Sequence, residues 1–251
     1  KNSSLLINNL SLIVLLITAV ITFNENIDIE KLTLFNGSVI VDYLSSLMKI
    51  ITLLATFIVL VISSSYLKVF NIQKIEYPIL ILSSVLGMMV MISSNDLIVF
   101  YMGLELQSLA LYVLATFNRD NLKSSEAGLK YFVLSALSSG LLLYGCSLIY
   151  GFSGSTNFEV IAMQLNTDQY PLTFGIVFIL VGLAFKISAV PFHMWAPDVY
   201  EGSPTTVTLF FTMVPKIAAL TVFIRFLYVP FLNVINQWQM IIIFLSIASM
   251  L

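Results

Sequence analysis

The sequence predicts an all-α membrane protein, a polytopic bundle of transmembrane helices, and three observations support this fold class. Hydrophobic residues make up 59% of the 251 residues and charged residues only 10%, whereas soluble domains carry about 25% charged residues. So few charges could not cover a water-soluble surface. Apolar runs about 20 residues long, enough to cross a bilayer core as helices, recur along the chain. These runs lack the period-two alternation of membrane barrel strands.

We expect seven complete spans and one incomplete span, at residues 5–23, 48–67, 78–93, 97–117, 125–150, 171–195, 205–229 and from 239 to the end. The third span is short, and Lys49 at the start of the second can extend its ammonium group to the interface. Two connections, residues 24–46 and 151–170, are long and polar and lie on the same side of the membrane. Phe35-Asn36-Gly37 predicts a turn within the first connection.

Loop charges predict the orientation. One face receives the basic residues Lys1, Lys68, Lys74, Arg119 and Lys123. The opposite face receives a single basic loop residue, Lys31. It also receives the acidic residues Glu25, Asp28, Glu30, Asp42, Asp96, Glu159 and Asp168. The positive-inside rule places the first face, and the first residue, on the cytoplasmic or matrix side. Only Lys49 and Arg225, at the outer ends of their spans, disagree with this assignment.

The fourth span carries a carboxylate, Glu105, near its middle. Its distances from the two ends of the span are about 12 Å and about 18 Å at a rise of 1.5 Å per residue. One interpretation is a protonated, hydrogen-bonded structural glutamate. The other is a carboxylate whose charge depends on a nearby lysine, so that it changes when that partner moves.

The sixth span contains Lys186, close to Pro191. A lysine at membrane depth costs at least about 2.5–3.5 kcal/mol, so it is rarely kept without a partner or a function. Pro191 should interrupt the helix, and we expect the break between Lys186 and His193. An interrupted helix beside an ionisable group is typical of transport sites. Snorkelling of Lys186 toward the nearby interface at Trp195 is the alternative.

Two further lysines lie inside spans. Lys216 follows Pro215 in the seventh span and lies about 16 Å from the start of that span, too deep for snorkelling. Lys130 lies only about 9 Å into the fifth span, so snorkelling remains open. Together with Glu105 and Lys186, these lysines could form a row of proton sites at similar depth. A buried lysine can lose its proton, and a carboxylate approaching or leaving it resets that equilibrium.

Other residue types exclude several classes of site. A single cysteine, Cys146, and a single histidine, His193, exclude a disulfide framework and a Cys- or His-cluster metal site. The net charge of −2 does not suggest nucleic acid as a partner. We expect no redox cofactor, nucleotide or metal on this chain, because no Gly-rich phosphate loop follows a strand. Trp195, Tyr200 and Tyr228 are interpreted as interfacial anchors.

Four stretches resemble the antiporter-like membrane subunits of respiratory complex I (NADH:ubiquinone oxidoreductase), most closely the branch called chain 2 or subunit N. They are Gly103-Leu104-Glu105-Leu106, SSEAGLKYFVLSALSSGLLLYG, GLAFKISAVPFHMWAPDVYEGSPTTV and PKIAAL. The resemblance implies that Glu105 and Lys186 are a coupled pair, Lys130 an intermediate relay lysine and Lys216 the central-channel lysine. It also implies two N-terminal helices with their loops in residues 1–77, the first of two inverted five-helix repeats in residues 78–229, and the start of the second repeat in residues 230–251.

By the same resemblance, the chain would take part in proton translocation as a subunit of NADH:ubiquinone reductase with no redox centre of its own. NADH, FMN, iron–sulfur clusters and ubiquinone would bind to other subunits. The partners would be the lipid bilayer and the other membrane-arm subunits, in the mitochondrial inner membrane or, alternatively, a bacterial plasma membrane. Family members continue beyond this sequence, so we expect either a piece of a longer protein or a split subunit completed by a second polypeptide.

Three alternatives remain at this point. A cation/proton antiporter subunit of the Mrp type shares the buried Glu and Lys pattern, as do the other antiporter-like subunits of complex I. Both usually have a second histidine in a PDAH-like motif, where this chain has Asp198-Val199-Tyr200. A structural protein with degenerate sites is the third alternative, and the presence of all four ionisable residues argues against it.

Overall fold

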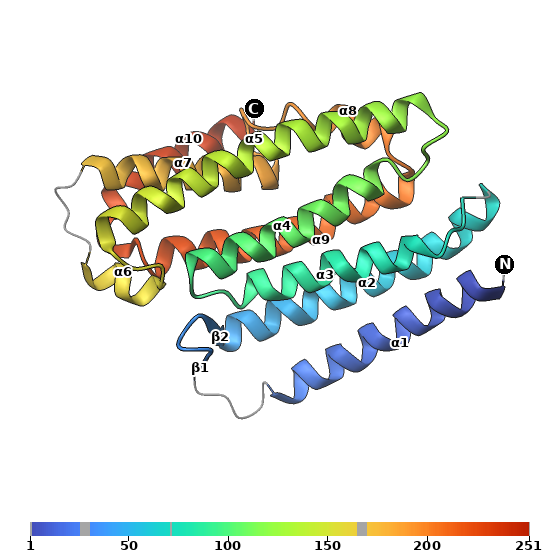
Figure 1. The fold of residues 1–251 in the computed structure, drawn as a ribbon, viewed down its shortest axis with the longest axis horizontal. Coiled ribbons are helices and arrows are strands. Elements are labelled where there is room, and N and C mark those ends of the chain that lie inside the picture. Colours follow the sequence, from blue (N-terminus) through green and yellow to red (C-terminus); the bar gives the residue numbers. More distant parts are fainter. Residues whose placement is uncertain (1, 26–30, 71, 165–169, 251) are drawn as a thin grey trace.

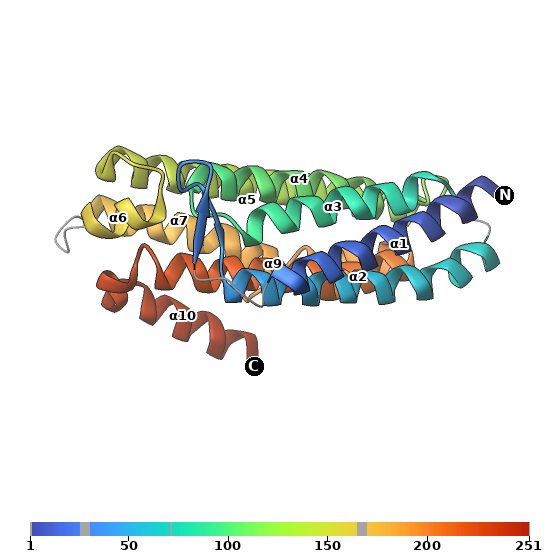
Figure 2. The same ribbon diagram turned by 90° about the horizontal axis from the view of Figure 1, so that it is seen from below.

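The computed structural model shows a bundle of long helices (Figure 1). It describes residues 2–25, 31–70, 72–164 and 170–250. The helices are α1 (Asn2–Glu25), α2 (Tyr43–Val69), α3 (Glu76–Ile92), α4 (Leu97–Ala115), α5 (Leu122–Ser153), α6 (Phe158–Gln164), α7 (Tyr170–Ile187), α8 (Ala196–Gly202), α9 (Thr205–Tyr228) and α10 (Ile235–Met250), the last preceded by the 3₁₀ turn η1 (Leu232–Val234). The long helices run side by side, with α10 at one edge of the bundle (Figure 2). The all-α membrane fold predicted from the sequence is confirmed.

The apolar helices match the predicted spans one for one. Six described segments are long and apolar enough to cross a bilayer, namely Ser4–Asn24, Tyr43–Val69, Leu97–Ala115, Leu122–Ser153, Thr205–Tyr228 and Leu232–Met250. Two more, Glu76–Ile92 and Leu172–Ile187, are apolar but shorter. The division of the chain at residues 77 and 229 stays a prediction. The orientation also stays a prediction, and it rests partly on Lys1, Asp28, Glu30 and Asp168, which lie outside the described residues, and on the side chain of Glu25, which does too.

The predicted interruption of the sixth span is confirmed, because α7 ends at Ile187 rather than continuing to residue 195. Ser188 adopts a left-handed conformation with φ 60°. Its N–H donates to the carbonyl of Phe185, and the N–H of Ala189 donates to the carbonyl of Ala184. This pair of hydrogen bonds is a Schellman motif, which ends a helix by satisfying its last carbonyls. Pro191 follows in the turn, where it cannot continue the helix.

The first polar connection contains a β-hairpin that the sequence analysis did not predict. Strand β1 (Leu32–Leu34) pairs antiparallel with β2 (Val39–Val41). The predicted turn lies between them, with positive φ at Phe35, Asn36 and Gly37. The carbonyl of Gly37 accepts from the side-chain amides of Asn95 and Asn157. These contacts join the hairpin to the loop before α4 and to the loop before α6. The helix α6, which lies in the second polar connection, was also not predicted.

Backbone-to-backbone packing fixes the helices that carry the candidate site. A Cβ atom added at Gly87 of α3 would lie 2.5 Å from the backbone nitrogen of Gln107 on α4. A Cβ atom added at Gly145 of α5 would lie 2.8 Å from the carbonyl of Gly175 on α7. Small residues at such crossings let apolar helices approach closely and pack well in a membrane. The pairs α3/α4 and α5/α7 are therefore closely packed, and this packing sets the positions of their polar side chains.

Arg225, which disagreed with the charge rule, is neutralised inside the fold. Its side chain is 2% exposed, and Nη2 forms an ion pair of 2.8 Å with Oδ1 of Asp42. Asp42 is also the N-cap of α2 and accepts from the N–H of Ser45. Burial on its own would raise the pKa of Asp42, but the hydrogen bond and the charge of Arg225 hold that pKa below its usual value. The pair joins α2 to α9. Because it has no net charge, Arg225 does not count against the orientation predicted from the loop charges.

Candidate functional site

Lys186 lies in the last turn of α7 and is only 8% exposed. Its Nζ donates to the Ser108 hydroxyl on α4 at 2.7 Å and to the Ser135 hydroxyl on α5 at 2.6 Å. Close packing of α5 against α7 brings Ser135 within reach. The side chain is therefore held inside the bundle by three helices, and the snorkelling alternative is wrong for Lys186.

The groups around Lys186 form a network of hydroxyls. Tyr112 of α4 donates its hydroxyl proton to Ser135 at 2.7 Å, and its ring centre lies 5.9 Å from Nζ of Lys186. Ser108 donates its own proton to the carbonyl of Leu104 and thus presents its oxygen to the lysine. Hydrogen bonds to a charged group are stronger than neutral ones, and an aromatic face adds a cation–π attraction. Among the residues that the structure describes, hydroxyl groups rather than a carboxylate accept the hydrogen bonds of this ammonium group.

Glu105 is half-buried on α4, and among the described side chains no ion pair joins it to Lys186. Glu105 and Ser108 are three residues apart, a spacing that puts both side chains on one face of a helix, about 5–6 Å apart at Cβ. Ser108, which contacts Lys186, therefore shares a helix face with Glu105, and the coupling of Glu105 to Lys186 stays a prediction.

Lys216 occupies the middle of α9, which passes through Pro215 without ending. It is half-buried, and its Nζ lies 5.6 Å from the ring centre of Tyr200 on α8. Within the part of the chain that the structure describes, Lys216 makes no hydrogen bond or ion pair. An aromatic face is thus the group that stabilises its charge.

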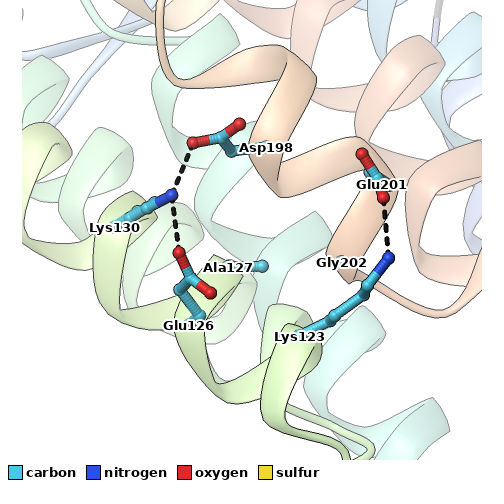
Figure 3. A pocket seen from close by; sticks show the side chains of 7 residues that line it. All are labelled: Lys123, Glu126, Ala127, Lys130, Asp198, Glu201 and Gly202. Atoms are coloured by element: carbon cyan, nitrogen blue, oxygen red, sulfur yellow. Dashed lines mark hydrogen bonds and ion pairs between the residues drawn. The ribbon is translucent and has the colours of Figure 1, made fainter.

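Lys130 does not share the environment of the other two lysines. Its side chain is 40% exposed and forms ion pairs of 2.7 Å with Glu126 of α5 and with Asp198 of α8. Figure 3 shows this cluster together with the neighbouring pair of Lys123 and Glu201. Helix α8, which follows the helix break, thus brings Asp198 and Glu201 to the first turns of α5. Lys130 is therefore exposed and ion-paired, unlike Lys186, and its place in the row of sites and its functional role stay predictions.

The interpretation of Trp195 as an interfacial anchor is also wrong. Trp195 is 3% exposed, and its ring stacks on Tyr131 of α5 at 4.7 Å and on Phe185 of α7 at 5.5 Å. Its Nε1–H donates to the Phe185 carbonyl at 3.0 Å. Tyr200 contacts both Trp195 and Lys216. These aromatic residues belong to the interior of the site.

The polar partners of Lys186 were not predicted from the sequence, although a signal for two of them exists. Ser108 and Tyr112 follow Glu105 by three and seven residues, which is the spacing of one helix face. Ser135 has no such signal, because its position depends on how α5 packs against α7. Among the residues that the structure describes, no group of three or more His, Cys, Asp and Glu side chains is arranged for a metal ion.

The fold and the site define a class, a polytopic membrane protein with an interrupted helix and buried ionisable side chains. The family described as "NADH:quinone oxidoreductase/Mrp antiporter, TM" matches residues 94–251. The chain belongs to this family, in agreement with the resemblance found in the sequence.

Three relatives define the similarity further. NADH-quinone oxidoreductase subunit N of Pelagibacter ubique is 73% identical over 251 residues, covering 100% of this chain and 53% of the relative. A chain of respiratory complex I from Thermus thermophilus with bound aureothin has a TM-score of 0.77 and 31% identity, covering 88% of this chain and 48% of that one. A chain of the Mrp complex from Dietzia sp. DQ12-45-1b shares the fold, with a TM-score of 0.78 and 24% identity, over 91% and 45% of the two chains. The sequence thus spans about half the length of the relatives it matches.

Proposed function

We propose that this chain contributes the first half of a proton-translocating membrane subunit of a respiratory NADH:quinone oxidoreductase. The observation that carries the proposal is Lys186, a buried lysine held by neutral hydroxyls, with the carboxylate of Glu105 one helical turn away from its serine ligand. Such an ammonium group can release its proton without breaking an ion pair. Similarity to subunit N of Pelagibacter ubique supports the same assignment.

Movement of Glu105 relative to Lys186 would drive the proton on and off the lysine. At an effective dielectric constant of about 20, a carboxylate about 4 Å from an ammonium stabilises it by about 4 kcal/mol, and at about 8 Å by about 2 kcal/mol. The difference of about 2 kcal/mol changes the protonation equilibrium about 30-fold, since about 1.4 kcal/mol is a factor of ten. A displacement of one side chain is therefore enough to load or unload the site.

The other lysines extend this path. Lys216, as a neutral amine, would receive the proton that leaves Nζ of Lys186, because the aromatic face beside its Nζ can stabilise the ammonium group that forms. Lys130 would stand at the exposed end, where Glu126 and Asp198 can exchange protons with water. Glu105, Lys130, Lys186 and Lys216 are thus the proposed relay, with Lys130 at its mouth rather than in the buried row.

The rest of the machinery would lie in other polypeptides. We place NADH, FMN, the iron–sulfur clusters and ubiquinone in other subunits, and we expect no redox centre on this chain. Its partners would be the neighbouring membrane-arm subunits and the second half of its own subunit. The relative from Pelagibacter ubique is bacterial, which favours the plasma membrane over the mitochondrial inner membrane as the location, with the first residue on the cytoplasmic side.

A cation/proton antiporter of the Mrp type is the second candidate, because the fold is shared with the Dietzia Mrp chain. Activity measurements on the purified native assembly distinguish the two candidate functions. We expect NADH:quinone reductase activity that drives proton translocation in reconstituted vesicles, lost in Lys186→Ala at equal assembled amount. Sodium/proton exchange without NADH oxidation would overturn the proposal and favour the Mrp-type function.

A further inference from the structure

Trp195 joins the two sides of the helix break. It lies directly before α8, yet its indole N–H donates to the carbonyl of Phe185, one residue before Lys186 in α7. That carbonyl also accepts from the N–H of Ser188 in the Schellman motif. A single side chain therefore fixes the end of α7 relative to the start of α8, across the turn that contains Pro191.

The same side chain lies between the two buried lysines. Tyr112 faces Lys186 and packs edge-on against Tyr131 at 5.0 Å, and Tyr131 stacks on Trp195. Trp195 then contacts Tyr200 at 5.9 Å, and the ring of Tyr200 faces Lys216. A continuous column of four aromatic rings from α4, α5 and the interrupted segment thus begins at one ammonium group and ends at the other.

We propose that Trp195 is a positioning residue that holds the Lys186 and Lys216 sites in the relative geometry needed for proton transfer between them. Trp195 touches neither ammonium group, so its effect passes through the Phe185 carbonyl on one side and Tyr200 on the other. Loss of the indole N–H frees the end of α7 from α8, and the Lys186 ammonium then moves independently of the ring that faces Lys216. The inference rests on the proposed proton relay.

The chain supplies a matched control. Its second tryptophan, Trp238 in α10, is buried and donates its N–H to the carbonyl of Phe231 at 2.8 Å. Trp238 has the same kind of hydrogen bond, from an indole to a carbonyl earlier in the chain, but it contacts none of the rings in the column. Trp195→Phe and Trp238→Phe therefore remove equivalent bonds, and only the first lies between the lysines.

The test uses the full-length subunit in its native assembly, in membrane vesicles, with protons translocated per electron measured at equal assembled amount. One positioning hydrogen bond corresponds to about a two- to tenfold effect. We expect Trp195→Phe to lower the ratio by that factor and Trp238→Phe to leave it unchanged. Trp195→Phe combined with Lys216→Ala should be no worse than Lys216→Ala alone, as for residues acting in one unit. If Trp195→Phe does not assemble, Tyr200→Leu removes the ring that faces Lys216 and should give the same loss.

The results distinguish a failure of the positioning role of Trp195 from a failure of the proposed proton relay. Equal ratios for Trp195→Phe and Trp238→Phe, or losses that simply add in the double variant, would overturn the positioning role of Trp195. An unchanged ratio in both Lys186→Ala and Lys216→Ala would instead overturn the proton relay itself.

Discussion

Removal of the Ser135 hydroxyl is a sharp test of how Lys186 is held. Ser135→Ala deletes an acceptor at 2.6 Å from Nζ of Lys186 and leaves the Tyr112 hydroxyl without its partner. A hydrogen bond to a charged group contributes about 1.5–3 kcal/mol and one to a neutral group about 0.5–1.5 kcal/mol. The ammonium form thus loses about 1–1.5 kcal/mol more than the amine, so we expect proton translocation to fall about 5- to 13-fold.

The assay is proton translocation in inverted vesicles driven by NADH, normalised to assembled complex. Ser135→Thr keeps the hydroxyl and should retain most of the rate. Ser147→Ala is the matched control, because Ser147 lies on the same helix and donates only to the carbonyl of Tyr144 in that helix. Full translocation by Ser135→Ala, or an equal loss in Ser147→Ala, would refute the role of the Ser135 hydroxyl in holding Lys186.

Three further predictions concern Lys186 itself, the ion pair between Asp42 and Arg225, and the packing of α3 against α4. Lys186→Arg should translocate protons as poorly as Lys186→Ala, because a guanidinium stays protonated; vesicle acidification measures this, and full activity would argue for a structural lysine. Asp42→Asn should destabilise the fold by about 3 kcal/mol, since it leaves the buried charge of Arg225 unpaired. The lowered pKa of Asp42 gives stability that is complete above its unfolded pKa of about 3.9 and is lost as the pH falls through the folded value, so thermal unfolding of Asp42→Asn should lack this acid dependence. Gly87→Ala should separate α3 from α4 and reduce the assembled amount, whereas Gly140→Ala, whose added Cβ meets nothing within 4 Å, should assemble normally.

Local chemistry explains which parts of the fold were predictable from sequence. The helix break was predictable because Pro191 and a charged residue lie together in one apolar run. The hairpin was not, since each strand has only three residues and is stabilised by distant side chains such as Asn157. Residues 32–34 are exposed, so the strand carries no burial pattern that a sequence could reveal.

The candidate site was only partly predictable for the same reason. Lys186 and Lys216 stood out because a charge within an apolar segment is costly wherever the helices pack. The partners of these lysines come from other helices, so Ser135 and Tyr200 could be identified only after α5, α7 and α8 were positioned. The ion pairing of Lys130 was not predictable, because α8, which brings Asp198 to it, follows the break in the sixth span.

The coupling of Glu105 to Lys186 is the central claim, and one set of variants tests it most directly. Protons translocated per electron should be measured for Lys186→Ala, Glu105→Gln and the double variant, in native assemblies at equal amount. Our account predicts a similar loss in each single variant and little further loss in the double, as for residues that act as one unit. Losses that add in the double variant, or full translocation by either single variant, would contradict it.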